Sequence, residues 1–186
     1  MTLPYQNQEF PDTLKSFSGL VLSVDLYLVR HGESGNSLAD SKRDNERPLT
    51  SEGREEVEEV ADSIRRLGVE FDEIATSPLP RAKETAQIIA KCQKKARLLV
   101  WDELRPEGDR RAMLSRLAKM GHESEVLLVG HEPYLTSVVA DLMGAKPGTI
   151  LLKKAGLVRI RVTSFAPSAK GELRWLLSPR VLKAID

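Results

Sequence analysis

A histidine flanked by an arginine and a glycine follows a run of apolar residues in the first part of the chain. The run Val24–Val29 alternates and then becomes fully apolar, which predicts a buried strand. Arg30, His31 and Gly32 come directly after it. Loops beyond the carboxyl ends of strands are where open α/β sheets bind ligands, and a glycine lets a ligand approach the backbone closely. A neutral imidazole can attack an electrophile whose negative charge the neighbouring arginine holds, so His31 is a candidate nucleophile.

Two further segments place similar side chains after predicted strands. The apolar run Glu125–Gly130 is followed by His131, so two of the three histidines come after strands. A third short strand, Glu73–Thr76, leads into a helix whose first turn contains Arg81. Backbone N–H groups and the helix dipole favour an anion at that position. The sequence therefore predicts an anion site that Arg30, His31, Arg81 and His131 share.

This ordered set resembles the histidine phosphatase superfamily. Three segments match the family signature in order, namely Arg30-His31-Gly32, Arg81 within Ser-Pro-x-x-Arg-Ala, and His131 after a glycine. The segments Arg47–Arg54, Leu104–Asp109 and Trp175–Pro179 resemble the family as well, the last two its short SixA-type branch of phosphohistidine phosphatases. The resemblance implies a phosphoglycerate mutase-like fold and a covalent phosphohistidine intermediate on the enzyme.

The implied chemistry suits these residue types. Each arginine can bind two phosphate oxygens with its planar guanidinium, and His131, if protonated, adds a charged donor. His31 must be neutral to attack phosphorus, with its other ring nitrogen bonded to an acceptor, and nearby cations lower its pKa. Because the guanidinium groups neutralise the phosphate, we expect neither a metal nor a cofactor.

The remaining site residues are less sharply defined by the sequence. Glu103, just after the predicted strand Leu98–Trp101, is the candidate general acid, with Glu107 and Asp109 as rivals. Gly32, Ser34 and Asn36 are candidate substrate-binding residues, although Ser34 and Asn36 can equally be loop caps. Arg54 either lines the site or is a solvated helix residue. Cys92 does not precede an arginine at the Cys-x5-Arg spacing that a cysteine phosphatase needs.

The predicted elements indicate an α/β protein, a three-layer α/β/α sandwich with a mostly parallel central sheet and helices on both faces. Helices are predicted from Thr50 to Leu67, from Pro80 to Lys91, from Arg110 to Met120 and from Pro133 to Met143. The stretches 156–162 and 173–177 alternate like antiparallel edge strands. Residues 1–23 are predicted to be an irregular extension, with one short helical turn near 13–17, and residues 24–186 a histidine phosphatase domain.

Composition limits the partners. The chain has 186 residues with 28 basic and 27 acidic side chains, so no global charge attracts nucleic acid, and no apolar run is long enough to span a membrane. One cysteine and no signal-peptide pattern predict a cytoplasmic enzyme. The short stretch between Arg81 and His131 predicts an open site, which favours a phosphorylated protein as substrate. A small-molecule phosphomonoesterase and a catalytically silent phosphoprotein-binding module remain alternatives.

Overall fold

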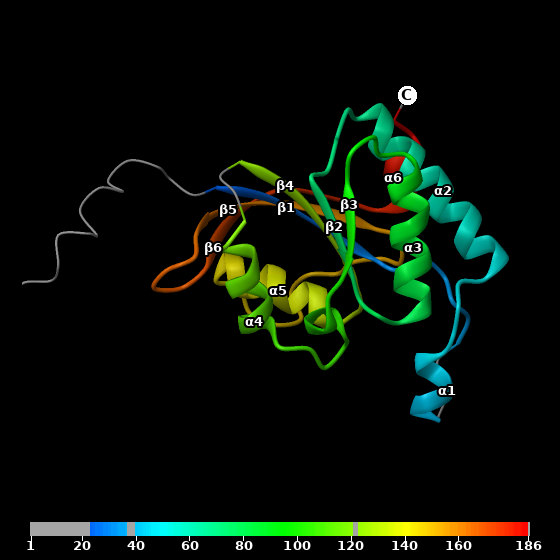
Figure 1. The fold of residues 1–186 in the computed structure, drawn as a ribbon, viewed down its shortest axis with the longest axis horizontal. Coiled ribbons are helices and arrows are strands. Elements are labelled where there is room, and N and C mark those ends of the chain that lie inside the picture. Colours follow the sequence, from blue (N-terminus) through cyan, green and yellow to red (C-terminus); the bar gives the residue numbers. More distant parts are fainter. Residues whose placement is uncertain (1–22, 37–39, 121–122, 186) are drawn as a thin grey trace, which may run out of the picture.

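Six strands form one sheet in the order β3-β2-β4-β1-β5-β6 (Figure 1). The computed structural model describes residues 23–36, 40–120 and 123–185. β3, β2, β4 and β1 run parallel, whereas β5 is antiparallel to both β1 and β6. The predicted mostly parallel central sheet is therefore confirmed. The strands are β1 (Val24–Arg30), β2 (Glu73–Thr76), β3 (Arg97–Val100), β4 (Ser124–Gly130), β5 (Leu157–Ser164) and β6 (Lys170–Leu177).

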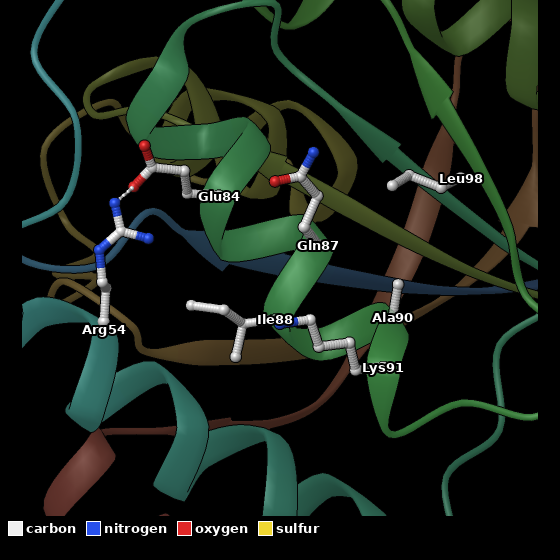
Figure 2. Close-up of a pocket in the computed structure, with 7 residues that line it drawn as sticks. All are labelled: Arg54, Glu84, Gln87, Ile88, Ala90, Lys91 and Leu98. Carbon is white, nitrogen blue, oxygen red and sulfur yellow. Dashed lines mark ion pairs between the residues drawn. The ribbon is translucent and has the colours of Figure 1, made fainter.

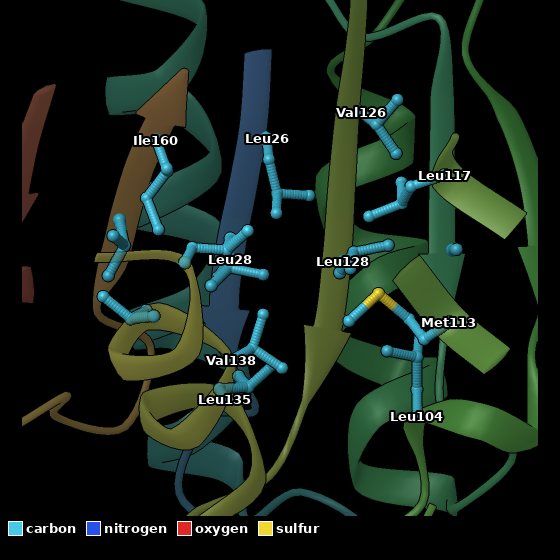
Figure 3. Packing of buried hydrophobic residues seen from close by; sticks show 14 of the residues in the cluster. Leu26, Leu28, Leu104, Met113, Leu117, Val126, Leu128, Leu135, Val138 and Ile160 are labelled. Carbon is cyan, nitrogen blue, oxygen red and sulfur yellow. The ribbon is translucent and has the colours of Figure 1, made fainter. Parts of the chain in front are cut away.

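Helices cover both faces of this sheet, as the three-layer prediction requires. One face packs against α2, α3 and α6 in a core that includes Tyr27, Ile64 and Ile89. The other packs against α4 and α5, where Leu28, Leu128 and Val138 meet (Figure 3). The helices are α1 (Ser41–Asn45), α2 (Ser51–Arg66), α3 (Pro80–Lys91), α4 (Arg110–Leu117), α5 (Tyr134–Met143) and α6 (Pro179–Leu182), with a 3-10 helix η2 (Asp102–Leu104).

The ends of the long helices follow from local sequence. The Thr50 hydroxyl accepts the Gly53 N–H at 3.0 Å and caps α2. Pro80 occupies the first turn of α3, where no N–H is needed. Gly144 ends α5 with a φ of 65°. The predicted helices at α2, α3 and α5 are confirmed.

Two predictions about the elements are wrong. α4 ends at Leu117 and not at Met120, because the following amides of Lys119 and Met120 bond to carbonyls three residues back. β5 is not an edge strand, because it pairs with β1 on one side and β6 on the other. Periodicity alone does not reveal how many neighbours a strand has. The short elements α1, η2 and α6 were not predicted, and the predicted extension lies outside the described residues except for Ser23.

The topology directs two chain segments to one crevice. β1 and β4 are neighbours, with Arg30 paired to Gly130 at their carboxyl ends. The chain leaves β1 toward α2 on one face and leaves β4 toward α5 on the other. Such a switch point opens a crevice beyond the strand ends. No helix in the described part of the chain has the length and apolar character needed to cross a bilayer.

Candidate active site

His31 is held as one defined neutral tautomer. Its Nδ1 lies 2.7 Å from the Gly32 carbonyl oxygen, which can only accept, so Nδ1 carries the proton. Its Nε2 accepts a hydrogen bond from Nε of Arg81 at 3.3 Å. The backbone N–H of His31 donates to Gly130 O at 3.0 Å, which attaches the loop to β4. The basic lone pair of His31 is therefore on Nε2, where it accepts a hydrogen bond from the Arg81 guanidinium.

The surroundings of His31 favour the neutral ring. The pKa of His31 is lowered from 6.5 to about 4. Burial is the largest cause, and the charges of Arg81 and Arg30 add to it, while the bond to Gly32 O opposes it. The sequence predicted the direction of this shift and its cationic cause. The structure adds burial as the larger cause, because only 6% of the residue's surface is exposed.

Close packing between a loop and a helix fixes the backbone around His31. A Cβ on Gly32 would lie 2.6 Å from Val57 Cγ2 of α2, and one on Gly53 would lie 2.1 Å from Glu33 O. Side chains therefore fit at neither position without displacing the loop or the helix. The N–H of Gly32 also donates to the Thr85 hydroxyl of α3 at 3.1 Å. Helices α2 and α3 thus set the direction of the nucleophile.

His131 lies beside His31 and has its own polar support. The two ring centroids are 5.1 Å apart. Nε2 of His131 is 2.8 Å from the Ser77 hydroxyl, while Nδ1 is buried without a partner. Ser77 Oγ also accepts the N–H of Leu79 at 3.3 Å. If the Ser77 hydroxyl donates to Nε2, then the Leu79 N–H, the Ser77 hydroxyl and Nε2 of His131 are all hydrogen-bonded. The proton of His131 is then on Nδ1, and this N–H is left free for a ligand.

The state of His131 differs from the charged donor considered from the sequence. The pKa of His131 is lowered from 6.5 to about 2, mainly by burial and further by the neighbouring His31, Arg81 and Arg30. His131 is therefore neutral in this site. A neutral ring still offers one N–H, so the donor that the sequence predicted is retained without its charge.

The two predicted arginines reach the same place from different elements. Arg81 is 4% exposed at the start of α3, and its Nη1 donates to Asp44 O at 2.9 Å. Arg30 ends β1, its Nη1 donates to Leu152 O at 3.1 Å, and its buried Nε has no partner. The structure thus brings together Arg30, His31, Arg81 and His131. Two of their nitrogens, Nε of Arg30 and Nδ1 of His131, are buried without a partner.

Residues beyond the predicted set complete the rim. Nη1 of Arg47 donates to the Ser34 hydroxyl at 2.8 Å, and its Nε donates to Asp44 Oδ1 at 2.9 Å. A carboxylate oxygen of Asp44 lies 3.8 Å from Arg81. Ser34 is therefore bonded to Arg47, whereas Asn36 is exposed. The signal that could have identified Arg47 was its place in the family-like segment Arg47–Arg54.

The candidate acids are less central. Glu103 forms an ion pair with Arg116 at 3.4 Å. Within the described residues, no contact joins Glu103 to the site formed by Arg30, His31, Arg81 and His131. Asp109 caps α4 through the N–H groups at 111 and 112, and Glu107 is exposed. Glu132, which the sequence reasoning missed, follows His131 directly. Burial raises its pKa against hydrogen bonds from Thr136 and the charge of Arg30.

Arg54 belongs to a separate pocket. Its guanidinium pairs with Glu84 at 2.7 Å between α2 and α3, in a pocket that Ile88 and Leu98 also line (Figure 2). Glu84 also accepts the N–H of Leu49 at 3.1 Å. This pair therefore connects the two helices. In the part of the chain that the structure describes, no three His, Cys, Asp or Glu residues are grouped to hold a metal ion.

Comparisons with known proteins find a family model, curated relatives and solved structures that are similar to this chain. The model of the histidine phosphatase superfamily (branch 1) matches residues 26–106. An uncharacterised protein of Picosynechococcus sp. is 34% identical over 86% of this chain and 99% of its own. The phosphohistidine phosphatase SixA of Escherichia coli is 27% identical over 86% of this chain and 97% of its own. A solved protein histidine phosphatase SixA with tungstate superposes with a TM-score of 0.71 at 27% identity, covering 84% of this chain and 97% of that one.

Proposed function

Since this chain belongs to the histidine phosphatase superfamily and is of the SixA type, we propose that it removes phosphate from phosphohistidine in a protein. That it is a phosphatase follows from the family. The observation that supports the proposed mechanism is the state of His31, with Nδ1–H bonded to Gly32 O and the lone pair on Nε2.

In the proposed reaction Nε2 of His31 attacks phosphorus. The phosphorus–nitrogen bond to the substrate imidazole breaks, and the new bond makes His31 the phosphohistidine intermediate. Before this attack, Arg81 redirects its Nε–H from His31 to a phosphate oxygen, which frees the lone pair on Nε2. Arg30 and the Nδ1–H of His131 bind the other oxygens. Water next attacks the phosphorus, inorganic phosphate leaves, and His31 regains its lone pair.

The substrate proposal rests on the likeness to SixA and on the leaving group. Imidazole leaves from phosphorus more readily than an alkoxide, so the reaction needs less help from an acid. The described structure gives Glu103 an ion pair with Arg116 and gives Glu132 a raised pKa next to His131. We therefore expect Glu103→Gln or Glu132→Gln to slow hydrolysis of an aryl phosphate more than that of a phosphohistidine protein. The variant with the larger effect identifies the acid.

The test uses a phosphohistidine protein, an aryl phosphate and a sugar phosphate without added metal. We expect far higher kcat/KM for the phosphohistidine protein, and a phosphate trapped on His31 when the reaction is quenched in base and digested for mass spectrometry. His31→Ala should fold normally by circular dichroism and form no intermediate. Efficient hydrolysis of the sugar phosphate with none of the phosphohistidine protein would favour a small-molecule phosphomonoesterase.

A further inference from the structure

A second concave surface shares Arg30 with the phosphate site. This open groove of about 540 Å³ is lined by four cationic side chains, Arg30, Lys153, Lys154 and Arg180, and by the carboxylate of Glu56. We call it the Lys153 groove. Its volume lies in the range of ligand-binding sites, roughly 300–1,000 Å³. Because Arg30 lines both surfaces, a substrate whose phosphate contacts Arg30 can continue into the groove.

The walls of the groove are fixed relative to the nucleophile. Arg30 donates to Leu152 O, and the N–H of Ala155 donates to Arg30 O at 3.0 Å, so the loop at 152–155 is bonded to the end of β1. Lys154 adds an ion pair with Glu33 at 2.6 Å. A second part of the lining is α6, which the fully buried Leu182 anchors in the core. Arg180 therefore projects from a docked helix.

The groove carries excess positive charge. Lys154 is neutralised by Glu33, but Lys153 and Arg180 are both exposed and have no ion-pair partner among the described residues. The one lining carboxylate, Glu56, also acts on Lys183, whose pKa it helps to raise, although the bond to Glu59 is the larger cause. Two unpaired cations next to an anion site attract an acidic partner.

We propose that the Lys153 groove binds an acidic segment that flanks the phosphohistidine in the protein substrate. The proposal rests on the proposed function, whose site it extends. Lys153 lies in the loop before β5 and Arg180 lies in α6, and both line the groove. Carboxylates spaced along an extended chain can reach both, whereas the second phosphate of a small molecule is a single compact charge. The groove would thus select among phosphorylated proteins while the phosphate site performs the reaction.

The test compares two phosphohistidine peptides that differ only in their flanking residues, Asp and Glu in one and Asn and Gln in the other. The enzyme variant is Lys153→Glu with Arg180→Glu. The matched control is Lys91→Glu with Lys95→Glu, the same change of charge on two exposed lysines. Lys91 ends α3 and Lys95 lies between α3 and β3, at the amino-terminal edge of the sheet. An aryl phosphate, which has no flanking chain, reports on the phosphate site alone.

We expect the groove variant to lose roughly tenfold in kcat/KM for the acidic peptide and to hydrolyse the neutral peptide and the aryl phosphate normally, because exposed contacts are individually weak and reversal adds repulsion. The loss should shrink as salt is raised. Equal kcat/KM of the native enzyme for both peptides, or the same loss in the control variant, would overturn the proposal that the groove binds an acidic segment. If neither peptide is hydrolysed, the proposed function fails, and inhibition of aryl phosphate hydrolysis by the acidic peptide then tests the groove separately. Tenfold weaker inhibition of the groove variant than of the native enzyme supports binding in the groove. No inhibition of the native enzyme overturns it.

Discussion

Ser77→Ala tests how the second histidine is oriented. The substitution removes a hydroxyl that is fully buried and lies 2.8 Å from Nε2 of His131. A buried ring nitrogen left without its partner costs roughly 1–3 kcal/mol, and about 1.4 kcal/mol corresponds to a factor of ten. If the bond holds Nδ1–H toward the phosphate, kcat/KM for an aryl phosphate should fall roughly 5- to 150-fold.

The matched control is Ser63→Ala. Ser63 is equally buried, but its hydroxyl donates to Glu59 O within α2, away from both histidines. We expect Ser63→Ala to affect the melting temperature and not kcat/KM. Nitrogen NMR of labelled imidazoles should show that His131 of the native protein carries its proton on Nδ1, and that Ser77→Ala loses this preference. Native-like kcat/KM in Ser77→Ala, or an unchanged tautomer, would refute the reasoning.

Other variants test the remaining charges. Arg81→Ala should lower kcat/KM at least tenfold, because a charge-assisted hydrogen bond is worth roughly 1.5–3 kcal/mol. A chelator should leave the activity of the native enzyme unchanged. Activity that is lost on chelation and restored by a divalent metal would contradict a metal-independent reaction. The imidazole signals of His31 and His131 should not titrate between pH 8 and 5, because their pKa values are about 4 and about 2. The unfolded chain takes up these protons near pH 6.5, so this part of the stability is present above pH 6.5. It is lost as the pH falls to about 4 for His31 and about 2 for His131, which thermal unfolding at several pH values will show as a falling Tm. The Asp44→Asn variant should bind inorganic phosphate a few times more tightly by calorimetry, because it removes a negative charge 3.8 Å from Arg81. A charge interaction at that distance is worth about 1 kcal/mol in water. Weaker binding would assign Asp44 to positioning Arg81 instead.

Local sequence determined where the long elements begin and end. Thr50 and Gly144 act within one turn of their own helices, and Pro80 constrains only its own backbone, so their effects could be predicted without tertiary contacts. The apolar runs that became β1 and β4 were recognisable for the same reason. The order of chemical residues after them identified Arg30 and His31 and their partners as one candidate site.

Only the tertiary structure decided how these residues act on each other. The pairing of β1 with β4 at a switch point brings His31 to 5.1 Å from His131, although 100 positions separate them in the chain. Burial by the surrounding helices is the larger cause of both lowered pKa values, and a sequence shows no burial. The partnership of Ser77 with His131 joins the end of β2 to the end of β4 and has no local signal. Sequence therefore specified which groups are present, and long-range packing specified their distances, tautomers and charges, because those depend on neighbours that are distant along the chain.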